Sequence, residues 1–265
     1  MEMVELKALT CRYGQEEVLH DIDLTFEEGK ITIIVGPNGC GKSTLLKSII
    51  GLNTDISGQI IVGGGSIEEL ESTALAQQVA YLPQNKIPTD IPVLRMVLHG
   101  RFPYLKYPRR YQKKDIEIAQ KALEQMGIGH LSDKNINRLS GGVQQKVYIA
   151  MALAQNTSTI LMDEPTVYLD VSYQIKLMEK ARELADSGKA VVMVLHDLTQ
   201  AFRIADKIVV MESGKIVMCA APEQVYESGI VECVFGIRMD RIQTKNGWQY
   251  FYDKAVCETE GSNCE

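Results

Sequence analysis

Residues 36–44 place three glycines and a lysine between a strand-like run and a stretch with helical spacing. They read Gly36, Pro37, Asn38, Gly39, Cys40, Gly41, Lys42, Ser43 and Thr44. The run before them, residues 31–35, is β-branched throughout, which favours a buried strand. Residues 42–50 contain no glycine or proline and are followed by Gly51, a residue typical of a helix end. The pattern therefore predicts a strand, a glycine-rich turn and a helix in an α/β core.

A turn in this context is typical of phosphate binding. Glycines let the backbone N–H groups turn inward around phosphate oxygens, and the helix N-terminus adds favourable partial positive charge. Lys42 can reach the β- and γ-phosphates, and the hydroxyl of Ser43 can ligate Mg²⁺. A chance match in a glycine-containing turn is the alternative, expected roughly once in a hundred chains of this length. We predict a site for a nucleoside triphosphate with Mg²⁺.

The length, net charge and hydrophobicity of the chain limit its domain organisation and the classes of protein to which it can belong. A chain of 265 residues permits one large α/β domain or a core with an inserted subdomain. The net charge of −6 argues against electrostatic nucleic-acid binding by the chain as a whole. The longest apolar run, near residues 190–195, is far shorter than a bilayer span, and the acidic start lacks a signal-peptide pattern. We expect membrane association only through a partner protein.

The six cysteines are scattered and form no Cys-x-x-Cys pair. This distribution indicates reduced thiols in the cytoplasm rather than a disulfide framework or a zinc site. Cys40 lies inside the glycine loop, where it is either a site of oxidation and alkylation or simply a small residue.

The pattern of apolar and polar residues changes along the chain and divides it into segments. Residues 4–10 and 19–26 alternate apolar and polar side chains, which predicts half-exposed antiparallel strands. The short apolar runs 159–162 and 190–195 predict strands of a parallel sheet that is covered on both faces. Residues 88–138 change to helical spacing, proline and basic residues, and we interpret them as an inserted helical subdomain.

The C-terminal part is expected to be small and β-rich. Residues 208–218 read as a hairpin turning at Ser213 and Gly214. We expect a main domain over residues 1–240 and an extension over residues 241–265 that ends in a mobile polar tail from residue 257.

Two carboxylates, Asp163 and Glu164, follow the strand at 159–162. Carboxylates at the end of a core strand are costly unless a charged group lies beside them, and nucleotide-bound Mg²⁺ would supply that charge. Asp163 would then hold the metal, directly or through water, and Glu164 would act as general base toward water. The alternative is an ordinary helix start, for which Pro165 is suited.

His196 follows the strand at 190–195, so it ends a third core strand at the edge where ligands collect. It could bind the γ-phosphate and orient Glu164 and the water. A satisfied core histidine is the alternative.

Another candidate helix begins after Ser140, Gly141 and Gly142. Ser140 is a suitable N-cap, and the glycines permit an anion to approach the helix N-terminus. An ordinary capped helix would look the same. The position of this segment, some twenty residues before Asp163, favours the functional interpretation.

Together these residues resemble those of ATP-binding cassette ATPases. The resemblance runs from about residue 4 to 237 and rests on residues 36–44, Gln84 in the segment 81–84, residues 139–142, Asp163 with Glu164, residues 167–170, and His196. It implies a P-loop NTPase core with a parallel sheet, an N-terminal antiparallel β subdomain and an inserted helical subdomain. It also implies that Tyr13 stacks on adenine and that Gln84 senses Mg²⁺.

Members of this family work as head-to-tail pairs. The resemblance therefore implies that Ser140, Gly141 and Gly142 of one copy close over the γ-phosphate bound by the other, with Asp170 at the shared interface. The chain departs from the family at Val143, where glutamine is usual. Valine cannot complete a capping box or make a polar contact to the partner's nucleotide.

The segments 81–84, 97–104, 196–201 and 214–222 resemble the ATPases of importers for iron–siderophore complexes, haem and cobalamin. This implies two copies beneath a polytopic permease dimer at the cytoplasmic face of the membrane, supplied by an extracytoplasmic binding protein, with no nucleic acid. The permease would contact residues around 88–110, whose aromatic and basic members suit a protein interface, namely Arg101, Phe102, Tyr104, Lys106 and Tyr107. A partly exposed loop is the alternative.

Other functions fit less well. An exporter ATPase is the nearest rival, although exporters often fuse membrane helices to the cassette. A cassette ATPase acting on ribosomes or DNA would usually carry a second cassette, a coiled coil or a basic surface. A small-molecule P-loop kinase would share residues 36–44 but has no need for residues 139–142 or His196.

Overall fold

A six-stranded sheet forms the centre of the molecule. The computed structural model describes residues 1–85, 90–245 and 247–254. The strand order is β10-β9-β3-β8-β7-β6, and all neighbours are parallel except β9 and β10. The strands are β3 (Ile31–Val35), β6 (Val79–Leu82), β7 (Thr159–Asp163), β8 (Ala190–Val194), β9 (Lys207–Glu212) and β10 (Lys215–Ala220). Every residue of β3, β7 and β8 is buried, as expected for strands covered on both faces.

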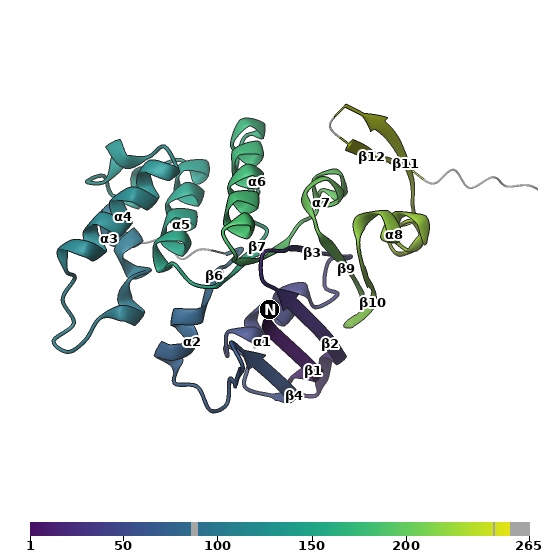
Figure 1. Ribbon diagram of the computed structural model, residues 1–265, viewed down its shortest axis with the longest axis horizontal. Coiled ribbons are helices and arrows are strands. Elements are labelled where there is room, and N and C mark those ends of the chain that lie inside the picture. Colours follow the sequence, from purple (N-terminus) through teal and green to yellow (C-terminus); the bar gives the residue numbers. More distant parts are fainter. Residues whose placement is uncertain (86–89, 246, 255–265) are drawn as a thin grey trace, which may run out of the picture.

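An antiparallel sheet lies against one face of the central sheet (Figure 1). Its strands are β1 (Glu2–Tyr13), β2 (Glu16–Glu27), β4 (Ile56–Val62) and β5 (Gly65–Ser66), in the order β2-β1-β4-β5. Helix α1 (Lys42–Ile49) joins both sheets in one apolar cluster, because its buried Leu45, Leu46 and Ile49 contact side chains from each. The expected α/β core with a parallel sheet and an antiparallel subdomain is thus confirmed.

The other face of the central sheet is covered by helices. These include α6 (Val171–Asp186) and α7 (Leu198–Ile204). Helices α3 (Val93–His99), α4 (Lys113–Gln125) and α5 (Gly141–Gln155) pack against one another at one end of the molecule, and α2 (Ser72–Gln78) lies beside β6. Three short 3₁₀ turns, η1 (Phe102–Tyr104), η2 (Gly129–Leu131) and η3 (Ile136–Arg138), connect these helices.

Arg101 lies inside this helical group rather than on its surface. Its guanidinium donates hydrogen bonds to Asp115 at 3.2 Å and to the carbonyl of Ala154 at 2.9 Å, and it covers the ring of Tyr104. Arg101 therefore links α4 to α5. The expectation that Arg101 is available to a partner is wrong, because its charge is already satisfied by Asp115.

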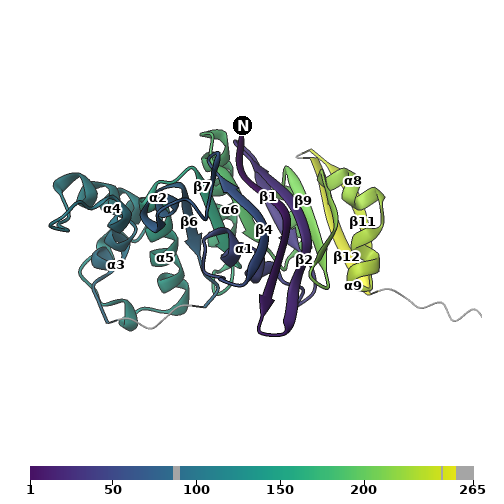
Figure 2. The same ribbon diagram turned by 90° about the horizontal axis from the view of Figure 1, so that it is seen from below.

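The C-terminal elements lie at the opposite end of the molecule from the helical group (Figure 2). They are α8 (Pro222–Glu227), α9 (Ile230–Phe235) and a hairpin of β11 (Ile237–Thr244) and β12 (Gly247–Lys254). Tyr250 docks the hairpin, since its ring lies 4.7 Å from that of Phe202 and 5.4 Å from that of Tyr226. The tail from residue 257, predicted to be mobile, lies outside the described residues.

No helix within residues 1–85, 90–245 and 247–254 is both long and apolar enough to cross a bilayer.

Candidate active site

The glycine loop joins β3 to α1 and turns where only glycine fits. At Gly36 a Cβ atom would lie 2.2 Å from the carbonyl oxygen of Met211. Gly41 has a φ of 100°, and its Cβ atom would lie 2.8 Å from Leu19. Side chains at either position would push the loop away from β9 and β2 and spoil its curvature. Cys40 is buried in the same turn, which agrees with the interpretation of a small packing residue.

Lys42 begins α1 and points back into the loop. Its ammonium group donates hydrogen bonds to the carbonyls of Gly36 at 2.8 Å and Pro37 at 2.7 Å. The ammonium group is thereby held beside the N-terminus of α1, where a phosphate oxygen would meet both charges. A cavity of about 380 Å³ opens here, lined by Val18, Asn38, Gly39, Gly41, Lys42, Ser43, Thr44, Gln84, Glu164 and His196.

Asp163 ends β7 and is 1% exposed. Its Oδ2 accepts a hydrogen bond from the hydroxyl of Tyr81 at 3.4 Å, whereas Oδ1 has no partner among the described residues. Burial raises the pKa of Asp163, and the neighbouring hydroxyl of Ser43 opposes that rise. A buried carboxylate oxygen without a partner beside a serine hydroxyl fits a hard divalent cation such as Mg²⁺.

Glu164 is held at both carboxylate oxygens. Oε1 lies 2.6 Å from Nε2 of His196, and Oε2 accepts a hydrogen bond from the amide of Gln84 at 2.6 Å. The backbone of Glu164 has a φ of 51°, which is strained for a residue other than glycine. The chain thus turns sharply after β7 and directs this carboxylate into the cavity, where it can accept a proton from water while His196 fixes its orientation.

Tyr13 is exposed and lies at the end of β1. Its hydroxyl donates a hydrogen bond to Asn53 at 2.8 Å, and Asn53 donates in turn to the carbonyl of Thr44 at 3.0 Å. The ring is thereby tied to α1 while 51% of the residue stays exposed, an arrangement that suits stacking on a planar base. Sequence reasoning missed Asn53 and Val18, because neither lies in a recognisable motif. It also missed the role of Tyr81, because within the segment 81–84 only Gln84 was assigned to the site.

Ser140, Gly141, Gly142 and Asp170 do not line this cavity. Ser140 occupies the N-cap position of α5, but its side chain makes no capping hydrogen bond, so its expected capping role is wrong. Gly142 is required, since a Cβ atom there would lie 2.7 Å from the carbonyl of Tyr168. The loop before α6 therefore packs directly on the start of α5.

Asp170 caps α6. Its carboxylate accepts hydrogen bonds from the backbone N–H of Tyr173 at 3.0 Å and the hydroxyl of Ser172 at 2.7 Å, and these hold the pKa of Asp170 below its ordinary value. The preceding Tyr168 is 74% exposed with a φ of 67°. A bulky side chain in this left-handed conformation is strained, which is common at functional positions.

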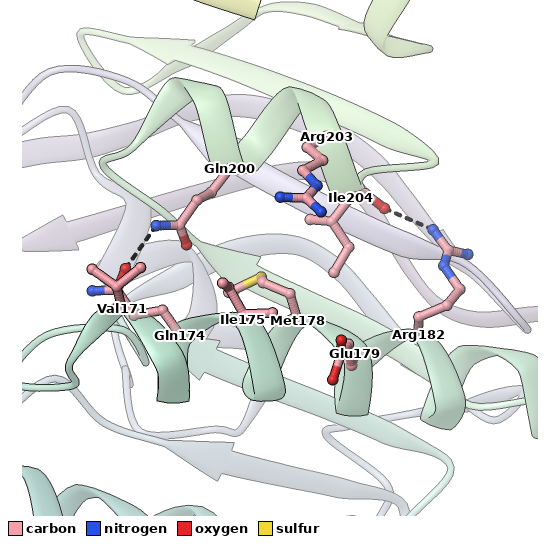
Figure 3. Close-up of a pocket in the computed structure, with 9 residues that line it drawn as sticks. All are labelled: Val171, Gln174, Ile175, Met178, Glu179, Arg182, Gln200, Arg203 and Ile204. Carbon is pink, nitrogen blue, oxygen red and sulfur yellow. Dashed lines mark hydrogen bonds between the residues drawn. The ribbon is translucent and has the colours of Figure 1, made fainter. Parts of the chain in front are cut away.

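A second cavity of about 390 Å³ lies between α6 and α7 (Figure 3). Val171, Ile175, Met178 and Ile204 give it an apolar lining, and a hydrogen bond of 2.9 Å between Gln200 and Gln174 crosses one end. No predicted site residue lines this cavity.

The ABC transporter family model matches residues 19–167. The chain belongs to this family. The ferric enterobactin transport ATP-binding protein of Escherichia coli K12 is 40% identical over 232 residues, covering 87% of this chain and 86% of the relative. The petrobactin import ATP-binding protein of Bacillus anthracis is 39% identical, with coverages of 88% and 86%.

Solved structures agree with this assignment. A structure described as an inward-facing conformation of a metal-chelate type ABC transporter has a TM-score of 0.81 at 26% identity, covering 96% of this chain and 97% of the other. The predicted family and fold are thus confirmed. The protein is an ABC transporter ATPase, a class of subunit that binds ATP and works with membrane permease subunits.

Proposed function

We propose that this ABC ATPase powers the import of an iron–siderophore, haem or cobalamin-type substrate through a permease dimer. The names of the relatives support import rather than export, and they include a cobalamin import ATP-binding protein of Halobacterium salinarum at 34% identity. The proposal of ATP hydrolysis rests on the position of Glu164. Gln84 and His196 hold its carboxylate at the cavity of the glycine loop.

Residues 36–44 would bind the phosphates of ATP, with Lys42 as the point charge and Tyr13 against the adenine. Ser43, Gln84 and Asp163 would hold Mg²⁺, with Tyr81 fixing the second oxygen of Asp163. When bound, the metal would neutralise charge on the phosphate oxygens.

Glu164 would accept the proton of the attacking water. Its hydrogen bond to His196 leaves this carboxylate with one orientation, so His196 would set the direction of proton transfer. Lys42 would stabilise the negative charge on the phosphates during cleavage.

A second copy of the chain would complete the site. Ser140, Gly141, Gly142 and Asp170 lie outside the cavity of their own chain, yet these residues offer a glycine-flanked helix N-terminus suited to a γ-phosphate. The surface beside Asp170 is apolar and exposed, since Val171 and Ile175 reach the rim of the α6–α7 cavity (Figure 3). Such a surface suits contact with another copy.

The permease would contact the helical group of α3, α4 and α5 from the cytoplasmic face of the membrane. Phe102 remains a candidate because it is exposed, whereas Arg101 is engaged internally. An extracytoplasmic binding protein would deliver the substrate, and no residue of this chain is expected to touch it.

Uptake into vesicles tests the proposal. Vesicles carrying this protein and the permease encoded beside it should accumulate labelled ferric siderophore, haem or cobalamin when ATP is enclosed on the side of this subunit. The Glu164→Gln variant should abolish uptake while leaving the complex assembled. ATP-driven efflux, or ATP hydrolysis without uptake of any of the three, would contradict import of this substrate class.

A further inference from the structure

Residues 105–112 connect η1 to α4, and with the first two residues of α4 they form a segment of strong positive charge, residues 105–114, here named the basic loop. It contains no acidic residue, and its basic members are Lys106, Arg109, Arg110, Lys113 and Lys114. The chain as a whole carries a net charge of −6, so this loop opposes the overall charge. Such a local reversal indicates a surface with its own anionic partner.

Most charges of the basic loop have no ion pair within the described residues. Within the described residues, an ion pair is found only for Lys113, which lies 3.8 Å from Glu117. The guanidinium of Arg109 lies 4.5 Å from the centre of the Phe102 ring, and the ring of Tyr107 is 97% exposed. Cations and an aromatic side chain are therefore presented to solvent together.

The base of the basic loop is fixed. Arg101 precedes it and Asp115 follows it, and their buried ion pair of 3.2 Å joins the two ends. The other oxygen of Asp115 accepts a hydrogen bond from the backbone N–H of Gln112 at 3.0 Å. The loop extends from the end of the helical group opposite the β11–β12 hairpin (Figure 1). This geometry presents its outer residues as a surface without a covering element.

We propose that the basic loop binds the headgroups of an anionic phospholipid bilayer beside the permease. Lysine and arginine near an anionic leaflet are attracted to it, and tyrosine lies favourably at the level of the headgroups. The sequence places Lys106 and Tyr107 in the expected permease contact, but a protein partner fits this loop less well, because three of its five cations are lysines and lysine is depleted from protein–protein interfaces. The inference goes beyond the proposed transport function and needs no nucleotide.

Flotation of the full-length protein with vesicles tests the inference. One set consists of phosphatidylcholine alone, and the other replaces part of it with phosphatidylglycerol. We expect binding only to the anionic set, and weaker binding at high salt. The combined Lys106→Gln, Arg109→Gln, Arg110→Gln and Lys114→Gln variant should bind more than a hundredfold less, since each cation contributes about fivefold. Tyr107→Ser should weaken binding without abolishing it.

A matched control removes the same charge elsewhere on the exposed surface, through Lys121→Gln, Lys134→Gln, Lys176→Gln and Arg238→Gln. This control should bind anionic vesicles like the wild type. Equal loss in both variants, or no binding by the wild type, would overturn the inference. Tighter, loop-dependent binding to single-stranded RNA or to the detergent-solubilised permease would also overturn it, in favour of those partners. ATP hydrolysis measured on the same proteins tests the proposed function separately.

Discussion

Glu164 combines a strained backbone with a carboxylate that is held at both oxygens. At the scale of single residues, this is the feature on which we propose that hydrolysis depends. We expect Glu164→Gln to bind ATP with near-normal affinity, because the fold of the loop does not depend on this carboxylate. Hydrolysis should fall by about 10²–10⁴-fold, since an amide cannot accept the proton. Phosphate release and calorimetry of ATP binding provide the measurements.

Two neighbouring variants separate binding from chemistry. Lys42→Ala should lose ATP binding because the loop loses its charge, whereas His196→Ala should keep binding and lose most hydrolysis. Normal turnover by Glu164→Gln or His196→Ala would remove that residue from the mechanism. Unchanged ATP affinity in Lys42→Ala would contradict the role of the glycine loop.

Val143 replaces the glutamine that is usual after the two glycines, and it packs partly against the core. The side chain of Ser140 makes no capping bond, so no capping box exists here. We expect Val143→Gln to keep the ATPase rate within about tenfold of wild type or to raise nucleotide affinity modestly, because the glutamine can bond the Ser140 N–H. A larger loss in a steady-state assay would show that the valine packing is required.

The residues of the candidate site were predictable where a motif carries them. Lys42, Asp163, Glu164 and His196 were placed from local sequence at strand ends, and the structure brings Lys42, Glu164 and His196 to one cavity. Tyr81 and Asn53 were not predictable in this way. Their contacts to Asp163 and Tyr13 join residues far apart in sequence, and such contacts depend on the packing of separate elements.

At the scale of elements, Asp170 stabilises the start of α6 in a pH-dependent way. Hydrogen bonds from Ser172 and Tyr173 lower the pKa of Asp170 in the folded state. The stability that Asp170 contributes is therefore complete above the ordinary aspartate pKa of about 4, and it is lost as the pH falls through the lowered pKa of the folded state. We expect Asp170→Asn to reduce Tm by up to about 3 °C at neutral pH. Thermal unfolding should show this difference vanish in acid; a difference independent of pH would contradict it.

Arg241 fastens the C-terminal hairpin to α8. Its guanidinium lies between the rings of Tyr226 at 4.6 Å and Trp248 at 4.4 Å, and it pairs with Glu223 at 3.2 Å and Glu227 at 3.3 Å. These contacts use both the charge and the flat stacking surface of the Arg241 guanidinium. A lysine at this position could not supply the two together.

We expect Arg241→Ala to release Trp248, the only tryptophan of the chain. The emission should shift to longer wavelength and become more easily quenched by acrylamide, and Arg241→Lys should show an intermediate effect. Arg238→Ala on the same strand is the matched control and should resemble the wild type. An unchanged spectrum for Arg241→Ala would show that Tyr250 alone docks the hairpin.

Most elements follow from local pattern. The buried strands β3, β7 and β8 were predicted because residues 31–35, 159–162 and 190–194 are continuously apolar or β-branched. The hairpin of β9 and β10 was predicted because Ser213 and Gly214 mark its turn. The interior position of Arg101 was not predictable, since an arginine beside aromatic residues in sequence resembles an exposed surface. Only the folded position of Asp115 reveals its role.

At the scale of the whole molecule, we propose that one chain holds two incomplete halves of a site. The cavity of the glycine loop contains Lys42 and Glu164 but not Ser140 or Gly142, which belong to another surface. Beside that surface Tyr168 is strained and exposed, and Val171 is 71% exposed. A second copy would cover these residues and supply the missing helix N-terminus to the phosphates.

The most direct measurement of this account is the molar mass of Glu164→Gln by light scattering, with and without Mg²⁺ and ATP. We predict a monomer without nucleotide and a stable dimer with it, because two copies close over ATP that cannot be cleaved. Combining Glu164→Gln with Gly142→Ala should prevent the dimer, since the added methyl group displaces Tyr168. A monomer in saturating ATP, even with the permease bound, would contradict the account.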